Sequence, residues 1–349
     1  MTLELATAGE SHGPALVAIL AGLPAGLVLD KKAIDADLRR RQQGYGRSPR
    51  QQIETDEVEV LAGLRHGRTL GTPLALVVRN RDHKNWTWGM APWPPEGEPV
   101  GKGTKPVTLP RPGHADLAGV QKYGLGDVRD ALERASARHT AVQVAAGAVA
   151  KTLLSHIGVE VRGTAGVDEA AIDAARMDKD TLGGIVEVRA TGVPPGLGSY
   201  ARKEDRLDAR LAAALMGIQA VKGMEIGDGF ALARMRGSEA HDEIGTDKRR
   251  TSNRAGGMEG GMSNGEEIVV RAAMKPLPTL MKPLASVDLA TGEAATALVE
   301  RSDVSAVEAL AVVAEAAVAW ELARAARDKF GGDALVDFVG AWRVYVERI

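Results

Sequence analysis

Two short segments hold a histidine between turn-forming residues. The first, Gly9–Gly13 (GESHG), sets Ser11 and His12 between two apolar runs. Glycine lets backbone N–H groups approach a ligand closely, and a serine beside a histidine can bind phosphate or transfer a proton. The second, Arg111–Asp116 (RPGHAD), holds His114 in a Pro-Gly turn next to an acid that could orient its ring. Taken alone, each segment also fits a polar turn whose histidine is merely hydrogen-bonded.

Arginines gather in several places, although the formal net charge of the chain is only −2. Guanidinium groups bind phosphate and carboxylate in a bidentate way. Each group alone is typical of a solvated face, but together they predict a local positive site for a compact polyanion. We expect Arg134 and Arg138 to lie one turn apart on one side of a helix. The set comprises Arg39, Arg40, Arg41, Arg47, Arg50, Arg134, Arg138, Arg254 and Arg301.

Other segments could enclose a ligand. Lys275–Thr279 (KPLPT) predicts a rigid, extended stretch with backbone N–H groups to offer. The glycines of Gly256–Gly261 could let a lid close and exclude water. We expect residues 245–265 to stay outside the core, and both this stretch and the long irregular stretch 80–111 to be mobile loops.

Composition excludes several classes of protein. There is no cysteine, so disulfides, thiolate nucleophiles and iron–sulfur clusters are excluded. The phosphate-loop, Rossmann and H-E-x-x-H patterns do not occur, and the adjacent His241, Asp242 and Glu243 suit loop hydrogen bonding better than a metal site. We expect no metal. The balanced charge argues against a nucleic-acid binder, no run is apolar enough for a membrane span, and the N-terminus lacks signal-peptide features. These points favour a cytoplasmic protein.

The elements that must position these residues alternate without a regular βαβ rhythm. We expect strands at 3–8, 15–20 and 184–190, and a helix over 32–41 capped by Asp30. A helix over 128–156 and a second long helix, opened by a capping box at Ser305 and Glu308 and ending near 327, complete the pattern. The strand–turn–helix sequence after 22–27 is echoed after 192–197, which suggests a faint internal duplication. We predict a layered α+β architecture.

Taken together, the motifs make the sequence closely resemble the chorismate synthase family over essentially its whole length. The blocks that carry this resemblance are 9–13 followed by GLP at 22–24, 111–116, 134–138 (RASAR) with Thr140, 227–230 (GDGF), 260–265 (GGMSNG), and 301–305 (RSDVS) leading into 313–316 (VAEA). The resemblance implies a single catalytic domain over 1–349. Its fold would be a β–α–β sandwich with long central helices and antiparallel or mixed sheets.

The resemblance also implies an activity. The family eliminates phosphate and a ring proton from 5-enolpyruvylshikimate 3-phosphate, which gives chorismate in the shikimate pathway. It requires reduced FMN, although no net redox change occurs. We therefore expect a monofunctional lyase that takes its reduced flavin from an external reductase. The family is usually a homotetramer.

The family's functional residues map onto positions of this chain. His12, supported by Ser11, would donate a proton at the departing phosphate, and His114 would protonate or polarise the flavin. Asp303 would assist removal of the ring proton. Arg41 and Arg47 match positions assigned to phosphate of substrate or NADP, and we favour anion contacts over an NADPH site. Flavin contacts map to Arg134, Ala135, Ser136, Gln219, Ala220, Gly260, Lys275, Pro276, Leu277, Pro278, Thr279 and Arg301.

Two positions depart from the family pattern. Ala135 stands where many members have serine, which removes a hydroxyl contact to the flavin, and His139 stands where glutamate is common. We expect His139 to face solvent. One alternative is a flavin- or phosphate-binding homologue without lyase activity. A more remote one is an RNA-binding module using Arg39 to Arg50 and the Gly- and Arg-rich stretch near Arg254, which an aromatic content of 3% disfavours.

Overall fold

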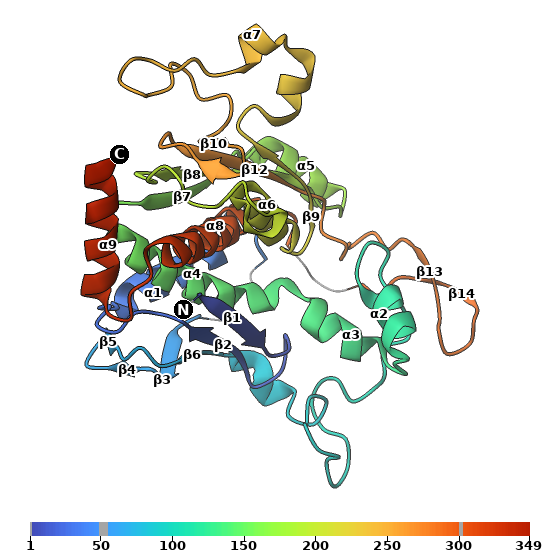
Figure 1. Ribbon diagram of the computed structural model, residues 1–349. Helices are drawn as coiled ribbons and strands as arrows, with labels where there is room; N and C mark the ends of the chain where they lie inside the picture. Colours follow the sequence, from blue (N-terminus) through green and yellow to red (C-terminus); the bar gives the residue numbers. More distant parts are fainter. Residues whose placement is uncertain (1, 49–54, 300–302) are drawn as a thin grey trace.

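Two four-stranded sheets enclose a layer of helices in the computed structural model, which describes residues 2–48, 55–299 and 303–349 (Figure 1). All strand pairs within both sheets are antiparallel. The predicted α+β sandwich with central helices is therefore confirmed. Among the described residues, no helix combines the length and apolarity that crossing a membrane requires.

The first sheet is built from the N-terminal part of the chain. Its strands run in the order β1 (Glu4–Ala8), β2 (Ala15–Ala21), β6 (Leu74–Arg79) and β3 (Val58–Ala62). Leu16, Ala18 and Leu20 of β2 alternate inward and are fully buried, as the period of two in a strand requires. The inner face of the sheet thus packs on helices, and the loop joining β1 to β2 carries Ser11 and His12.

The second sheet repeats the topology of the first. Its strands run in the order β7 (Glu160–Ala165), β8 (Gly184–Thr191), β12 (Ile268–Met274) and β9 (Val221–Ile226). Both sheets therefore have the order first, second, fourth, third. In each half a helix follows the second strand: α1 (Lys31–Gln42) and α6 (Leu207–Met216). This shared arrangement supports the predicted internal duplication.

The central layer is formed by α4 (Thr140–Ser155) and α8 (Val307–Phe330), which pack against each other. Helix α4 also contacts β2 and β6, while α8 contacts β7 and β8. Gly147 lies at the point where the helices cross, and a Cβ added there would lie 2.3 Å from the Cβ of Ala316. Small side chains therefore let the two backbones approach closely.

Gly147→Ala is expected to destabilise the protein although alanine is the better helix former. The helix preference for alanine contributes about 1 kcal/mol, whereas overpacking a tight core typically costs about 1–3 kcal/mol. The free energy of unfolding, measured with urea, should fall. As a matched control, Gly340→Ala in α9 meets no atom within 4 Å and should raise it slightly. An equal gain in both variants would contradict the close crossing.

A buried carboxylate ties four elements of this layer together. Glu315 of α8 is 1% exposed and accepts two hydrogen bonds from Arg40 at 2.8 Å. It also accepts from Lys151 of α4 at 2.5 Å and from the backbone N–H of Gly163 in β7 at 2.8 Å. Burial alone would raise the pKa of Glu315, but these donors outweigh it and lower the pKa to about 2. Arg40 therefore serves the helix layer, and it is not part of an anion site.

Stability should fall as Glu315 takes up its proton. The unfolded carboxyl titrates near 4.3 and the folded one near 2, so the native state binds the proton less readily. The stabilisation, roughly 3 kcal/mol from the size of the shift, is present above about pH 5 and lost as the pH falls toward 2. Urea unfolding at pH 7 and pH 3 should show a smaller loss for Glu315→Gln than for wild type. Equal losses would contradict this role.

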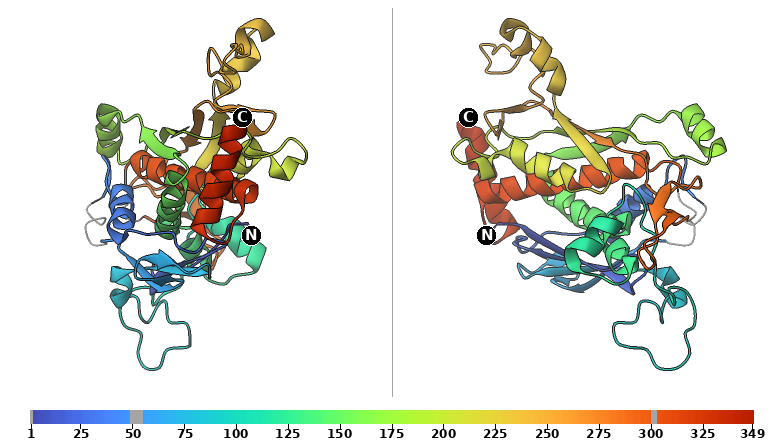
Figure 2. Two further views of the ribbon diagram at one scale, coloured as in Figure 1. Left: turned by 60° about the vertical axis from the view of Figure 1, so that its left-hand side comes forward. Right: turned by 90° about the vertical axis from the view of Figure 1, so that its right-hand side faces the viewer.

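The remaining elements flank the sandwich. They are β4 (Leu64–Arg65), β5 (Arg68–Thr69), η2 (Arg81–Asn85), α2 (Asp116–Tyr123), α3 (Val128–Ala135), η3 (Ala137–His139), α5 (Glu169–Met177), η4 (Lys203–Asp205), η5 (Gly229–Arg234), α7 (Gly237–Ala240), β10 (Met258–Glu259), β11 (Met262–Ser263), β13 (Ala285–Val287), β14 (Ala294–Thr296) and α9 (Leu335–Arg348). The segment around α7 and the segment following η2 project from opposite ends of the molecule (Figure 2).

Three predictions about these elements are wrong. The helix expected over 128–156 is broken at Ser136, which is extended. The capping box fails because α8 begins after Ala306, and the Glu308 carboxylate instead accepts the backbone N–H of Tyr45. The glycine-rich stretch is not entirely outside the core either. Met258 is 6% exposed and packs in the main hydrophobic cluster.

Candidate active site

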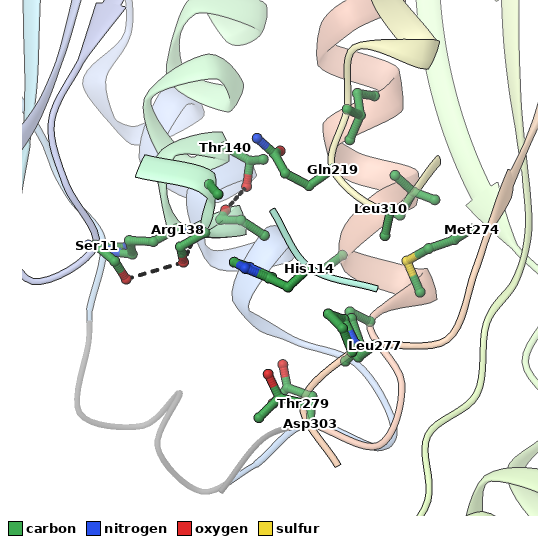
Figure 3. Close-up of a pocket in the computed structure, with 18 of the residues that line it drawn as sticks. Ser11, His114, Arg138, Thr140, Gln219, Met274, Leu277, Thr279, Asp303 and Leu310 are labelled. Atoms are coloured by element: carbon green, nitrogen blue, oxygen red, sulfur yellow. Dashed lines mark hydrogen bonds between the residues drawn. The ribbon is translucent and has the colours of Figure 1, made fainter. Parts of the chain in front are cut away.

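A cavity of about 500 Å³ opens where the first turns of α4 and α8 meet the β1–β2 loop (Figure 3). Residues 111–115 and 274–279 form other parts of its wall. Most of the predicted site residues line it, although they are spread over the whole sequence. They are Ser11, His12, Arg41, Arg47, His114, Ala135, Ser136, Gln219, Ala220, Lys275, Leu277, Pro278, Thr279 and Asp303.

Some predicted residues do not line this cavity. Arg134 is exposed, and its guanidinium turns away to donate to the carbonyl oxygens of Thr7 and Gly9. Pro276 lies in the wall segment but is not a lining residue, and Gly260 forms the turn between β10 and β11. Arg301 and Arg50 fall outside the described residues, and Arg254 pairs with Asp228 at 2.9 Å, away from the cavity.

The break between α3 and α4 brings the first histidine loop to the cavity. Ser136 sits at the break, accepts the backbone N–H of Arg138 at 3.3 Å, and its hydroxyl contacts that of Ser11 at 3.2 Å. Because the helix stops here, Arg134 and Arg138 point in different directions. The expectation that both share one helix face is therefore wrong.

His12 is held on one side by a buried carboxylate. Its Nδ1 lies 2.9 Å from Glu133 Oε1, and its backbone N–H donates to Glu133 Oε2 at 2.8 Å. The indole of Trp86 stacks on the imidazole with ring centroids 4.0 Å apart. Trp86 belongs to the long 80–111 stretch, so part of that stretch is packed against the cavity wall.

His114 is held in a similar way. Its Nδ1 contacts the carboxylate of Asp116, which is fully buried and also accepts from Arg111 Nε at 2.9 Å. Burial alone would raise the pKa of Asp116, but the hydrogen bonds from His114 and Arg111 outweigh it and hold the pKa well below its usual range. Arg111 also donates to Thr279 Oγ1 at 3.1 Å. The pair of segments around 111 and 279 is thus cross-linked at the cavity wall.

A buried aspartate organises two cavity arginines. Asp56 has no exposed surface and accepts from Arg41 Nη2 at 2.8 Å and from Arg138 Nη1 at 2.7 and 2.8 Å. Burial would raise the pKa of Asp56, but the two positive charges lower it overall. Burial lowers the pKa of Arg41, which Asp56 counteracts. Two guanidinium groups against one carboxylate leave this wall with a net positive charge.

Asp303 and Arg47 form an ion pair in another part of the cavity wall. Arg47 Nη1 lies 2.7 Å from Asp303 Oδ2, and the backbone N–H of Ser48 donates to Asp303 Oδ1 at 2.7 Å. Burial lowers the pKa of Arg47, and the charge of Asp303 opposes this. These two contacts fix the position of the Asp303 side chain in the cavity wall.

His139 and Gln219 form a neutral polar contact in the wall. Gln219 Nε2 lies 3.0 Å from His139 Nε2, and His139 is 8% exposed, so the expectation that it faces solvent is wrong. Burial lowers the pKa of His139. Next in the chain, Ala220 has a φ of 68°, a strained conformation for a residue with a Cβ. Its carbonyl accepts the Lys275 N–H at 2.9 Å, which fixes the strand end at the cavity.

Several residues that line the cavity or contact its lining residues were not predicted as site residues. Glu133 directly precedes the block 134–138, and Arg111 lies in the His114 motif, so their neighbourhood was a usable signal. Asp56 gave none, because its partner Arg138 lies 82 positions away in the chain. Trp86 was visible only as part of an irregular stretch.

Comparison with known proteins gives matches that cover the whole chain. The chorismate synthase family model matches residues 3–167 and 164–326. A chorismate synthase from Rubrobacter xylanophilus is 53% identical, covering 100% of this chain and 98% of the relative, and one from a Parafrankia species is 55% identical, covering 98% of each. A crystal structure of a chorismate synthase superposes with a TM-score of 0.79 at 37% identity, covering 100% of this chain and 98% of that one.

The alignment to the Rubrobacter relative contains gaps in this chain. The alignment to the Rubrobacter protein spans 385 positions, whereas this chain has 349 residues. The two matched segments of the family model overlap at 164–167, at the end of β7 and before α5. No residue of α5 lines the cavity, so the elements that form its wall lie on either side of this junction. The chain belongs to the chorismate synthase family.

Proposed function

We propose that this chain converts 5-enolpyruvylshikimate 3-phosphate to chorismate with loss of phosphate, using reduced FMN. The observation that carries the proposal is that two carboxylate-bound histidines, His12 and His114, share one cavity with four arginines and Asp303. Membership of the family supports the same reaction. A binding protein without lyase activity would need the cationic wall but not this set of proton-transfer groups.

The cavity residues suit a flavin and an anionic substrate. The volume lies within the range of ligand pockets, and Ala135, Ala220 and Ala309 give it an apolar surface for a flat ring. Within the described part of the chain, Gln219 Oε1 and the Nε atoms of Arg41 and Arg47 are buried without a hydrogen-bond partner. Such atoms are costly unless a ligand completes them. The Gln219 acceptor matches the N–H groups of a flavin, and the Arg41 and Arg47 donors match anionic oxygens.

The flavin would be held by Ser136, Gln219, Ala220 and the segment 275–279, and when bound it supplies the electron density that weakens the carbon–oxygen bond. The chain's own groups do the remaining work. Arg41, Arg47 and Arg138 would hold the phosphate and carboxylates, and His12 would give a proton to the leaving phosphate. Asp303 would help remove the ring proton, and His114 would hold a proton beside the flavin. An imidazole suits such tasks because its ordinary pKa lies near neutrality.

The test is an anaerobic assay with chemically reduced FMN and 5-enolpyruvylshikimate 3-phosphate, following phosphate and chorismate together. Equal release of both products is the expected result. FMN binding without either product would contradict the lyase and favour the binding homologue. The same assay with oxidised FMN and NADPH should give no turnover, because we further propose a monofunctional enzyme supplied by an external flavin reductase.

We also propose that the enzyme works in the cytoplasm as a homotetramer, as its family resemblance implies. Light scattering of the purified protein measures its mass in solution. A stable monomer with full activity would contradict the tetramer.

A further inference from the structure

Glu133 holds the loop that carries Ser11 and His12 through both its side-chain carboxylate and its backbone carbonyl. It lies on α3, three residues before the extended Ser136, and its side chain is 2% exposed. Its carboxylate receives both the backbone N–H and the ring Nδ1 of His12, and its carbonyl accepts the Ser11 N–H at 3.1 Å. One residue therefore fixes both the backbone and the ring of the loop.

The face of the same ring is fixed by a second contact. The indole of Trp86 lies on the imidazole at an interplanar angle of 21°. Its own Nε1 donates to Asp82 Oδ2 at 2.9 Å. The Arg129 guanidinium lies 5.0 Å from the Trp86 centroid and 3.4 Å from Glu133 Oε1. Glu133 thus holds the edge of the His12 ring, and Trp86 packs on its face.

A carboxylate can only accept hydrogen bonds, so it selects one tautomer of the neutral ring. Burial would raise the pKa of Glu133, but the hydrogen bonds and charge of His12 and Arg129 lower it overall, which keeps the group ionised near neutral pH. The proton of neutral His12 then resides on Nδ1. Proton exchange with a ligand in the cavity must go through Nε2, the nitrogen on the other side of the ring.

We propose that Glu133 is the positioning residue for His12, setting its tautomer so that Nε2 serves the cavity, with Trp86 fixing the plane of the ring. The proposal rests on the proposed role of His12 in phosphate loss. A positioning carboxylate of this kind does not exchange protons itself. It determines which ring nitrogen does.

The test is Glu133→Gln, which keeps the size of the side chain and adds an N–H donor. The side-chain carbonyl oxygen of the glutamine can still accept the His12 backbone N–H. Its side-chain NH2 group then faces Nδ1. That geometry requires Nδ1 to accept and moves the ring proton to Nε2. We expect ¹⁵N NMR of histidine-labelled protein, at a pH where the ring is neutral, to show the Nδ1–H tautomer in wild type and the Nε2–H tautomer in the variant. His12→Ala identifies the signal.

Turnover of Glu133→Gln should fall about 10²–10⁴-fold, the usual range for a lost acid–base contribution, while FMN affinity stays within about twofold. Glu133→Asp keeps the charge and should keep the Nδ1–H tautomer with a smaller loss. Asp130→Asn, an exposed change on the same helix, should alter neither readout.

An Nε2–H tautomer in the wild-type protein would overturn the proposal without any variant, so it stays testable even if Glu133→Gln fails to fold. An unchanged tautomer in a folded Glu133→Gln protein would overturn it as well. An inverted tautomer with unchanged turnover would support Glu133 as the residue that sets the ring, and would instead refute the catalytic role of His12.

Discussion

Asp303→Asn is expected to lower turnover about 10²–10⁴-fold while leaving FMN binding intact, because general-base assistance usually contributes that much. Asparagine can still accept the Ser48 N–H, so the local backbone should keep its position. It cannot take up a proton, and it removes the negative charge 2.7 Å from Arg47. Steady-state turnover with reduced FMN measures the first effect. Titration with FMN, followed by flavin fluorescence, measures the second.

The matched control is Asp173→Asn. Asp173 also pairs with an arginine, Arg176, and accepts from the Tyr45 hydroxyl, but its side chain is 48% exposed and does not line the cavity. We expect wild-type turnover from this variant. Near wild-type turnover from Asp303→Asn would rule out the proposed base. Loss of FMN binding in Asp303→Asn would mean that its main role is to organise the pocket.

Asp56→Asn should give the largest loss of stability, about 3–5 kcal/mol in the free energy of unfolding. The side chain keeps its size, but Arg41 and Arg138 lose the negative charge with which both of them pair. Removing one member of a buried ion cluster leaves uncompensated charge in a low dielectric, which typically costs this much. The two guanidinium groups also repel each other across the vacated charge. Urea unfolding at pH 7 measures the change.

Glu59→Gln is the control for this prediction. Its partner Arg79 lies 3.1 Å away, but both side chains are about half exposed, and exposed pairs contribute only about 0–1 kcal/mol.

Added inorganic phosphate should raise the midpoint of thermal unfolding more for Asp56→Asn than for wild type, because the cavity wall then has a greater excess of positive charge. A loss below 1 kcal/mol from Asp56→Asn would contradict the assigned role of this cluster.

The contrast between Asp56 and Glu133 shows how far a single sequence reaches into the site. Glu133 directly precedes the motif block 134–138, so its neighbours identify the region even though its contact with His12 spans 121 positions. Asp56 lies in no motif, and nothing in its neighbours indicates that it will be buried. Only the packing of α1 against α4 brings Arg41 and Arg138 to it. A buried charged residue can be predicted from a sequence only when its partners lie nearby in the chain. Partners that are distant in the chain leave no local pattern.

The sequence by itself determined the elements whose signals are local. Asp30 caps α1 as expected, with its carboxylate accepting the Lys32 N–H at 2.9 Å, and the repeated strand–turn–helix pattern indicated the duplicated topology. Motif order was enough to identify the family. These features depend on periodicity, turn residues and capping, all of which act over a few residues.

Only the tertiary structure decided which polar groups meet. The break at Ser136, the burial of His139, the use of Arg40 for Glu315 instead of an anion site, and the placement of Trp86 on His12 all depend on contacts between distant segments. In each case the local preference is weak or points elsewhere, as with the helical sequence around Ser136. Burying a charge or a polar ring costs free energy unless the group is paired, and this cost outweighs the local preference. The partners that offset the cost are those that the completed fold provides.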